Sequence, residues 1–449
     1  MKSILPYSAA LAATFLFYST ANADKLPQSP NIVLIMADDM GYECLGVNGS
    51  ISYHTPILDR IANQGIRFTH CFSQPLCTPS RLKIMTGKYN YRNYEHFEYL
   101  NPNQKTFGNY LKEAGYSTCI AGKWQLNGIA QNLPGNERTD RPNHFGFDEY
   151  CLWQLNTPGS KGERYADPLI VQNGKELEGL ENSYGPDIFS DYVCNFIERN
   201  TGKPFFIYYP MVLVHSPFLP TPDSPEWADP AKRKIPNNRY FKDMVEYTDK
   251  IIGKIEAKLK EQGLLENTIL LFTGDNGTNV NITTLTKNGL IKGAKSFTID
   301  AGCHVPLIAS WPKFMKKSQI HEPLIEFSDF LPTLLDAAGF TNQDKDIDGK
   351  SFYSVLKGQN NPTRETVFVH YDPRQGGASR NRNRFARTIE YKLYRDNRFF
   401  KPGNDPLEIH PLTTLNPKEE SIRSELQKIL DKAEKESPWK TEMTNSKIK

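Results

Sequence analysis

The sequence predicts an α/β fold in which a large, mostly parallel sheet is sandwiched by helices and a smaller C-terminal α+β subdomain follows. An uninterrupted apolar run at residues 32–36 is typical of a strand buried on both faces of a parallel sheet. Amphipathic helices and short apolar strands then alternate along the chain, which is the order that produces parallel sheets. Beyond residue 360 this alternation gives way to short strands separated by polar turns.

The individual elements follow from periodicity and from residues that end helices. Apolar residues on one face, often followed by a closing glycine, predict helices at 55–64, 106–114, 187–199, 241–261 and 329–338. Runs rich in β-branched and aromatic residues predict strands at 116–121, 205–213 and 268–272. The C-terminal part is expected to hold strands at 367–370, 387–389 and 391–394 and a charged amphipathic helix at 417–436.

The first 23 residues have the pattern of a signal peptide. A basic start precedes an apolar stretch, and Ala21-Asn22-Ala23 provides an A-x-A cleavage site. We therefore expect a signal peptide at 1–23, a catalytic α/β domain at 24–360 and a C-terminal subdomain at 361–449. The protein is expected to be exported, to the periplasm or the extracellular space. No other apolar run is long enough for a membrane anchor.

Composition excludes several classes of protein. A chain with 38% hydrophobic and 23% charged residues is globular rather than disordered. The net charge of +3 gives no reason to expect nucleic acid as a partner. Seven scattered cysteines do not form a disulfide scaffold, and the odd number leaves at least one thiol unpaired.

Unusual polar groups follow four of the predicted strands. They are Asp38 and Asp39, the segment Gly-Lys-Trp-Gln at 122–125, His215, and Asp275 with Asn276. Since functional groups collect at the carboxyl ends of strands in open α/β sheets, we expect one shared site. Three carboxylates and a carboxamide offer only oxygen ligands, which favours Ca²⁺ over Mg²⁺ and argues against zinc.

The most specific motif is Leu-Cys-Thr-Pro-Ser-Arg at 76–81, followed by Thr86-Gly87. With NIVLIMADDMG, AGKW, VHSPF, FTGDNG and GAKSFTIDAGCHVPLIASWP, it resembles the type I, formylglycine-dependent sulfatases of the alkaline phosphatase superfamily. The resemblance covers essentially the whole mature chain. Pro79 suits the first turn of a helix, so Cys77 is expected at a helix N-terminus, where backbone N–H groups favour an anion. Arg81, four residues on, is expected on the same helix face.

The resemblance implies roles for these residues in sulfate ester hydrolysis. A formylglycine-generating enzyme would oxidise Cys77, and one hydroxyl of the hydrated aldehyde would attack sulfur while the other later expels sulfate. It implies Ca²⁺ bound by Asp38, Asp39, Asp275, Asn276 and modified Cys77, with Arg81 holding the modified side chain. It also implies that Lys123 and Lys295 bind the sulfate and that His215 is the general acid. Lys292 competes for the role of Lys295, but its spacing fits less well.

Gln125 departs from this pattern. The family usually continues Gly-Lys-Trp with histidine, which assists sulfate release, whereas glutamine cannot take a proton. We therefore expect Gln125 beside Cys77 and another titratable group, such as a histidine from a neighbouring loop, within reach. The segment near residue 300 also departs, with Asp-Ala-Gly-Cys-His where the family tends to have Glu-Gly-Gly.

The C-terminal part offers clues to the substrate. Arginines gather there, and His370 and Arg374 are candidates for the mouth of the pocket; the cluster fits recognition of a sulfated saccharide as well as it fits a solvated basic face. Two further functions remain open at this point. One is hydrolysis of phosphate or phosphonate esters by the same nucleophile, and the other is a catalytically weak glycan-binding protein, which Gln125 suggests.

Overall fold

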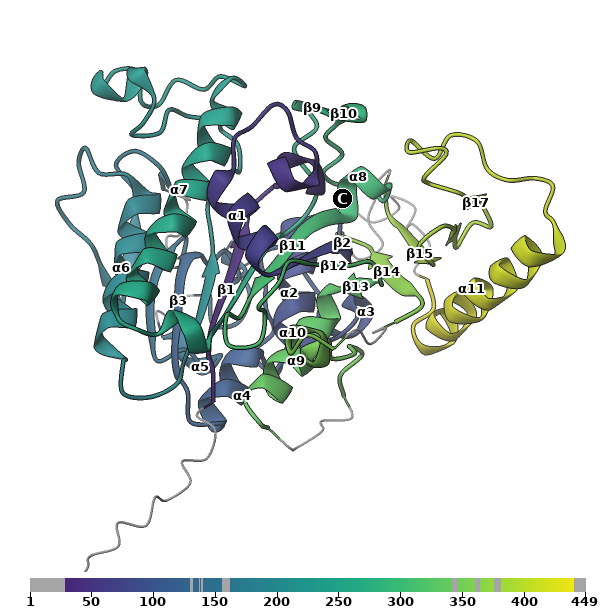
Figure 1. Cartoon of the computed structure of the whole chain (residues 1–449), viewed down its shortest axis with the longest axis horizontal. Helices are drawn as coiled ribbons and strands as arrows, with labels where there is room; N and C mark the ends of the chain where they lie inside the picture. The colour runs from purple at the N-terminus through teal and green to yellow at the C-terminus, as the bar shows by residue number, and fades with distance from the viewer. Residues whose placement is uncertain are drawn as a thin grey trace, which may run out of the picture.

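A mixed eleven-stranded sheet forms the centre of the protein in a computed structural model (Figure 1). The structure describes residues 29–129, 132–136, 138, 140–155, 162–340, 346–359, 364–374 and 381–439. The expected signal peptide at 1–23 lies outside these residues. The spatial order of the strands is β12-β2-β11-β8-β1-β7-β3-β4-β5-β6, with β13 also paired to β2. The strands of this sheet are β1 (Asn31–Ala37), β2 (Ile66–Phe72), β3 (Ser117–Lys123), β4 (Glu149–Trp153), β5 (Ile170–Gln172), β6 (Lys175–Glu176), β7 (Phe205–Pro210), β8 (Thr268–Gly274), β11 (His304–Ser310), β12 (Gln319–His321) and β13 (Ile325–Glu326).

The middle of the sheet is parallel, as the sequence predicts. Strands β8, β1, β7, β3 and β4 pair in parallel, whereas β11 is antiparallel to both β8 and β2. Every residue of β1 is buried, because Ile32 and Leu34 pack on one face of the sheet and Val33 and Ile35 on the other. The parallel arrangement brings the carboxyl ends of β1, β3, β7 and β8 to one edge.

Helices cover both faces of this sheet, as Figure 1 shows. The helices that pack on the face of Val33 are α1 (Pro56–Gln64), α6 (Gly185–Arg199) and α7 (Tyr240–Glu261). Those on the opposite face are α2 (Cys77–Thr86), α4 (Phe107–Glu113), α9 (Phe330–Ala337) and α10 (Tyr353–Leu356). The predicted helix positions are confirmed to within a few residues at each end.

Shorter elements connect these layers. The short helices are α3 (Asn90–Asn93), α5 (Arg141–His144) and α8 (Asp300–Cys303), and the 3₁₀ turns include η1 (Tyr42–Cys44), η2 (Gly46–Asn48), η4 (Pro225–Ala228), η5 (Leu265–Asn267) and η6 (Phe327–Asp329). A separate hairpin is formed by β9 (Thr283–Thr286) and β10 (Gly289–Lys292).

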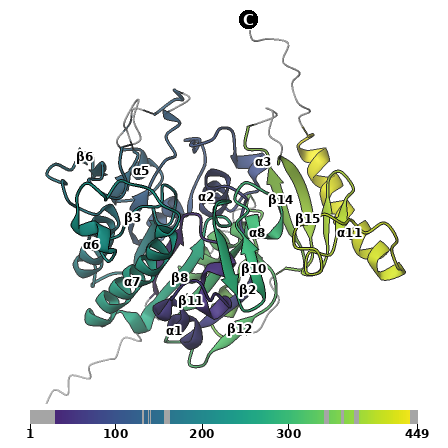
Figure 2. The same cartoon turned by 90° about the horizontal axis from the view of Figure 1, so that it is seen from above.

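The C-terminal part is a small antiparallel sheet backed by one helix, at the edge of the molecule in Figure 2. Its elements are β14 (Val367–Tyr371), β15 (Asn383–Arg387), β16 (Lys392–Tyr394), β17 (Phe399–Phe400) and α11 (Pro417–Glu436). The predicted strand at 387–389 is misplaced, because Thr388 N–H bonds the Tyr391 carbonyl at 2.9 Å and closes a turn there. The strand ends at Arg387 instead. The helix predicted at 417–436 is confirmed.

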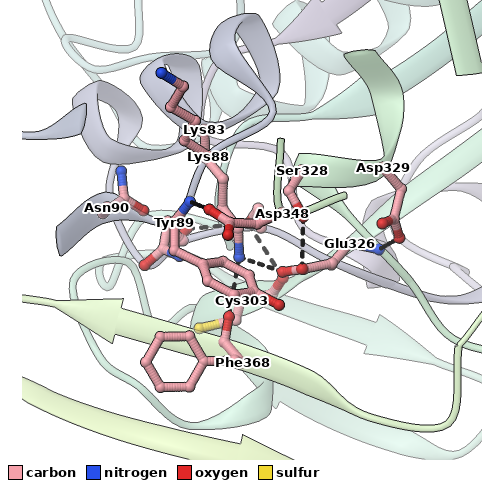
Figure 3. A network of polar contacts seen from close by, with 12 residues as sticks. Lys83, Lys88, Tyr89, Asn90, Cys303, Glu326, Ser328, Asp329, Asp348 and Phe368 are labelled. Carbon is pink, nitrogen blue, oxygen red and sulfur yellow. Dashed lines mark hydrogen bonds and ion pairs between the residues drawn. The ribbon is translucent and has the colours of Figure 1, made fainter. Parts of the chain in front are cut away.

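A buried network of charges joins α2 to the C-terminal sheet (Figure 3). The Lys83 ammonium pairs with Glu326 and donates to the Phe368 carbonyl of β14 at 3.0 Å. Arg364 contacts the same Glu326 carboxylate at 3.0 Å and also pairs with Asp329. The side chains of Lys83, Glu326 and Asp329 are fully buried. The helix that begins at Cys77 is thus fixed to the strand that carries His370.

All seven cysteines are free and buried. None of the helices within the described ranges has the length and the hydropathy needed to cross a lipid bilayer.

Candidate active site

The acidic residues that follow β1 and β8 meet at one edge of the sheet. The Asp39 N–H donates to Asp275 Oδ1 at 2.9 Å, and Asn276 Nδ2 donates to Asp39 Oδ1 at 2.9 Å. One ligand atom each from Asp38, Cys77 and Asp275 lies within 4.8 Å of the other two. The parallel pairing of β1 with β8 therefore gathers side chains that are more than 230 positions apart in the sequence.

This cluster has the ligands that a hard cation requires. Asp38 Oδ1 and Asn276 Oδ1 are buried and have no hydrogen-bond partner among the described residues. Buried polar atoms are nearly always paired, so two orphaned oxygens beside three carboxylates fit a bound cation. The donors that Asp38, Asp39, Asp275 and Asn276 offer are oxygen atoms, which suits Ca²⁺.

Two lysines lie against the same carboxylates. Lys123 Nζ is 2.7 Å from Asp38 Oδ2, and Lys295 Nζ is 2.6 Å from Asp39 Oδ1. Burial by itself would lower the pKa of both ammonium groups. The negative charge of Asp38 outweighs this effect for Lys123, and that of Asp39 outweighs it for Lys295, so both pKa values are raised. Lys292, the competitor of Lys295, is exposed at the end of β10.

The carboxylates respond to this environment in opposite directions. Burial alone would raise the pKa of Asp38, but the charges of Lys123, His215 and Lys295 hold it well below its ordinary value. For Asp275, burial raises the pKa well above that value, and the charges of Asp38 and Asp39 add to the rise. The two lysines thus leave Asp275 without enough positive charge, which a divalent cation would supply.

Cys77 begins α2 and is 3% exposed. Burial raises the pKa of its thiol, so an unmodified Cys77 would be a weak nucleophile at neutral pH. Arg81 lies one turn further along α2, but its guanidinium donates to the backbone carbonyls of Lys123, at 2.6 Å, and of Trp124. Arg81 therefore fixes the segment after β3 to α2, and its described bonds go to this backbone rather than to Cys77.

His215 follows β7 and belongs to the acidic cluster, since one ligand atom each from Asp38, Asp39 and His215 lies within 4.8 Å of the other two. Its Nε2 is 3.9 Å from Asp39 Oδ2, while Nδ1 lies 3.1 Å from Arg164 Nη1. Burial lowers the pKa of His215 to about 4, against the opposing effect of the Asp39 and Asp38 charges. Arg164 also stacks over the Trp153 ring, 4.2 Å from its centroid. No motif in the sequence marks Arg164, whose position depends on the fold.

Gln125 points at another side chain that the sequence did not single out. Its Nε2 donates to Glu98 Oε1 at 2.5 Å, and both residues are buried. The Glu98 N–H in turn donates to the hydroxyl of Thr78, the residue after Cys77, at 3.2 Å. The titratable partner of Gln125 is thus a glutamate, and the group expected within reach of Cys77 stays a prediction.

His370 lines a cavity of about 450 Å³ at the junction of the two parts of the protein. The other lining residues are Tyr91, Arg92, Tyr94, Glu95, His96, Asp372, Arg384, Ser437 and Pro438. Burial raises the pKa of the Tyr94 hydroxyl, and the charges of Tyr371 and Cys77 add to the effect. A larger cavity of about 610 Å³ lies near Leu324 and Tyr391 and is lined by none of the predicted site residues.

The arginines of the C-terminal part are largely used for ion pairs. Arg382 binds Asp372 through two nitrogens, at 3.1 and 2.8 Å, and Arg387 binds Asp300 at 2.6 Å. Arg384 donates to His370 Nδ1 at 2.7 Å and to Glu434 at 2.9 Å. Arg374 is exposed in the turn after β14, and Arg380 lies outside the described residues. These pairs favour a structural role for the arginine cluster over either the sulfate-binding or the solvated alternative.

Comparisons with known proteins agree with this geometry. A model of the sulfatase family matches residues 30–340, and one described as "N-sulphoglucosamine sulphohydrolase, C-terminal" matches 293–436. The chain is 32% identical to mouse N-acetylgalactosamine-6-sulfatase over 74% of this chain and 67% of that protein. The chain belongs to the sulfatase family, and it is an enzyme that hydrolyses sulfate esters.

Solved structures share the fold. The crystal structure of Ps i-CgsB superposes with a TM-score of 0.75 at 24% identity, over 93% of this chain and 96% of that one. That of BT4656, in complex with its substrate D-glucosamine-2-N,6-O-disulfate, gives a TM-score of 0.72 at 24% identity, over 91% and 98% of the two chains. The two-part architecture is therefore common to these proteins.

Proposed function

We propose that this sulfatase acts on a sulfated saccharide, with a formylglycine made from Cys77 as nucleophile and Ca²⁺ as cofactor. The single observation that carries the proposal is the convergence of Cys77, Asp38 and Asp275 at the carboxyl ends of β1 and β8, beside two lysines. A formylglycine supplies an aldehyde whose hydrate can attack sulfur and later release sulfate, and Ca²⁺ supplies positive charge.

The residues of the chain divide the remaining tasks. Asp38, Asp39, Asp275 and Asn276 hold the cation. Support comes from the closeness of Asp38 to Asp275 and of Asp38 to Asp39, and from the hydrogen bond of Asn276 to Asp39. Lys123 and Lys295 bind the sulfate oxygens once the cation takes over their present carboxylate partners. His215, whose Nε2 lies 3.9 Å from Asp39 Oδ2, protonates the leaving oxygen once the negative charge of the bound sulfate ester favours its protonated form. Arg81 positions the Lys123 segment by binding its backbone.

The saccharide is assigned to the cavity beside Tyr94 and His370. Its volume of about 450 Å³ falls within the usual range of small-molecule pockets, and tyrosine and histidine rings with acidic neighbours suit sugar faces and hydroxyls. Relatives in the comparisons are named for sulfated amino sugars, which supports this substrate class. His370 is proposed as a wall of that cavity, and the exposed Arg374 as a contact at its mouth.

We also propose export to the periplasm or the extracellular space, and oxidation of Cys77 by a formylglycine-generating enzyme. The A-x-A site at Ala21-Asn22-Ala23 supports the first. The Cys-Thr-Pro-Ser-Arg segment at 77–81 supports the second. Mature chain from the native host should begin at Asp24, and peptide mass should show an aldehyde in place of the Cys77 thiol.

The decisive experiment is a desulfation screen across defined sulfated saccharides, with Cys77→Ala as control. We expect release of sulfate from one class of saccharide and none with Cys77→Ala. A matched pair of aryl sulfate and aryl phosphate tests whether the nucleophile prefers phosphate esters. Faster hydrolysis of the phosphate, or activity with an intact Cys77 thiol, would refute the proposal.

A further inference from the structure

Glu98 is a buried carboxylate that none of the roles above uses. Its side chain is 4% exposed, and that of its partner Gln125 is 8% exposed. Both residues adopt left-handed backbone conformations, with φ of 60° for Glu98 and 45° for Gln125. Residues other than glycine adopt this region at a cost, and the surrounding structure must hold them there. The fold therefore specifies this pair.

Backbone hydrogen bonds tie Glu98 to the segment that carries the proposed nucleophile. The Glu98 N–H is bound to Thr78 Oγ1, and the Glu98 carbonyl accepts a bond from the Gly128 N–H at 2.6 Å. Thr78 follows Cys77 directly in the first turn of α2, and Gln125 lies two residues after Lys123. The anchors of Glu98 thus come from the two segments that carry the nucleophile and a sulfate-binding lysine.

Turnover through the proposed nucleophile requires two proton transfers at different places. One proton goes to the leaving oxygen of the substrate, which His215 can supply from the side of Asp39. Another must leave the nucleophile when sulfate is released. The Gln125 amide has no basic site for it, whereas a glutamate carboxylate can act as a general base. Glu98 is a carboxylate held by Thr78 and Gln125, which flank Cys77 and Lys123 in the sequence.

We infer that Glu98 is the proton acceptor of the sulfate-release step and that Gln125 orients its carboxylate; this rests on the proposed function. In that step the O–H bond of the hydroxyl left on the Cys77-derived carbon breaks, and its electron pair forms C=O. The C–O bond to sulfate breaks, and its electron pair leaves with the sulfate. The proton passes to Glu98, directly or through one water, and then to solvent.

The test measures the release of alcohol and the release of sulfate separately in Glu98→Gln. This variant keeps the size and shape of the side chain and removes its basic carboxylate. Rapid mixing with an activated aryl sulfate should give a normal first burst of one alcohol per active site. Steady-state turnover should fall by ~10²–10⁴-fold, the usual contribution of a general base. Intact mass should show enzyme carrying one SO₃ group, a readout that does not depend on turnover.

Two further variants exclude a purely structural effect. Glu149→Gln makes the same chemical change at the opposite, amino end of β4, where Glu149 pairs with Arg199, and should leave both phases unchanged. Adding Gln125→His to Glu98→Gln supplies a new base beside the site and should raise turnover at least tenfold above that of Glu98→Gln alone.

The alternative outcomes are distinct. A rise in KM without sulfated enzyme would make Glu98 a substrate contact, and equal loss of both phases would make it structural; either result overturns the inference. Failure of the proposed function would be visible in the wild type alone, as an unmodified Cys77 thiol or the absence of turnover, and the assignment of Glu98 would fall with it.

Discussion

Lys123 Nζ lies 2.7 Å from Asp38 Oδ2, and both side chains are buried. In this arrangement the ammonium group partly neutralises a carboxylate that is proposed to bind Ca²⁺. Lys295 makes the same kind of contact with Asp39. If Ca²⁺ binds these carboxylates as proposed, the two lysines would exchange their carboxylate partners for sulfate oxygens, and sulfate binding would depend on cation binding.

The first prediction concerns that link. Ca²⁺ should raise the melting temperature of the wild type, since a ligand at a hundred times its Kd stabilises a protein by about 2.7 kcal/mol. Inorganic sulfate should add further protection only when Ca²⁺ is present. Asp38→Asn should abolish both shifts, whereas Asp431→Asn on the exposed surface of α11 should retain them. Sulfate protection in the presence of a chelator would contradict the link.

His215→Gln tests the general acid through the leaving group. A protonating residue matters most when the departing alcohol is poorly acidic. For a saccharide sulfate we expect kcat to fall by ~10²–10⁴-fold. For a nitrophenyl-type sulfate, whose leaving group needs no proton, the fall should be small. Equal losses on both substrates would assign His215 to the cation site or to folding instead.

His370→Gln tests the proposed saccharide cavity. The glutamine oxygen can still accept the hydrogen bond that Arg384 Nε now donates to His370 Nδ1 at 2.7 Å. The imidazole ring, which packs 5.5 Å from Trp439 between ring centroids, is lost. We expect KM to rise severalfold for the saccharide and to stay unchanged for a small aryl sulfate. Michaelis constants for the two substrates provide the comparison, and a parallel rise in both would contradict this position for the sugar.

Lys83→Met should destabilise the whole protein. It leaves the fully buried Glu326 carboxylate with less compensation, and breaking such pairs costs about 3–5 kcal/mol. Lys88→Met is a matched control, because Lys88 pairs with the exposed Asp346 and should lose less than about 1 kcal/mol. Chemical denaturation measures both values. Equal losses in the two variants would argue against a special cost of the buried charge.

From the burial of His321 we predict how the free energy of unfolding changes as the pH falls. Burial lowers the pKa of His321 to about 4, and its Nε2 has no hydrogen-bond partner among the described residues. The unfolded chain takes up this proton below about pH 6.5, while the folded chain does not until about pH 4. The unfolded state thus binds more protons in this window, and stability falls as the pH falls through it. His321→Phe should reduce that fall, as measured by denaturation at pH 7 and pH 5; an unchanged slope would refute the assignment.

The sequence was sufficient to predict where the acidic cluster lies, but not how every side chain points. Asp38, His215 and Asp275 follow buried apolar strands, and strand order in a parallel sheet brings such ends together. The antiparallel direction of β11 was not predicted, because the residue pattern of an apolar strand does not indicate whether it runs parallel or antiparallel to its neighbours. The strand predicted at 387–389 was misplaced because a backbone turn at Thr388 outweighs the β-branched residues there.

Contacts between distant segments account for the remaining differences. The sequence did not indicate that the Gln125 amide binds Glu98, which reaches it from a segment held by Thr78. The arginine-rich segment left two alternatives open, because nothing local indicates that Arg382 and Arg387 pair with Asp372 and Asp300. Ion pairs between elements depend on the packing of those elements, which local patterns do not encode.

The bond from Lys83 to the Phe368 carbonyl limits how substrate preference can be exchanged between related enzymes. A chimera that replaced residues 361–449 would bring in a foreign β14 and a foreign partner for Glu326 in place of Arg364. The incoming part would have to compensate the buried charges of Lys83 and Glu326. Otherwise it would leave a buried ion without a partner next to α2, the helix that begins at Cys77. Grafts of residues 361–449 should therefore fold only when Lys83, Glu326, Asp329 and Arg364 are transferred as a set.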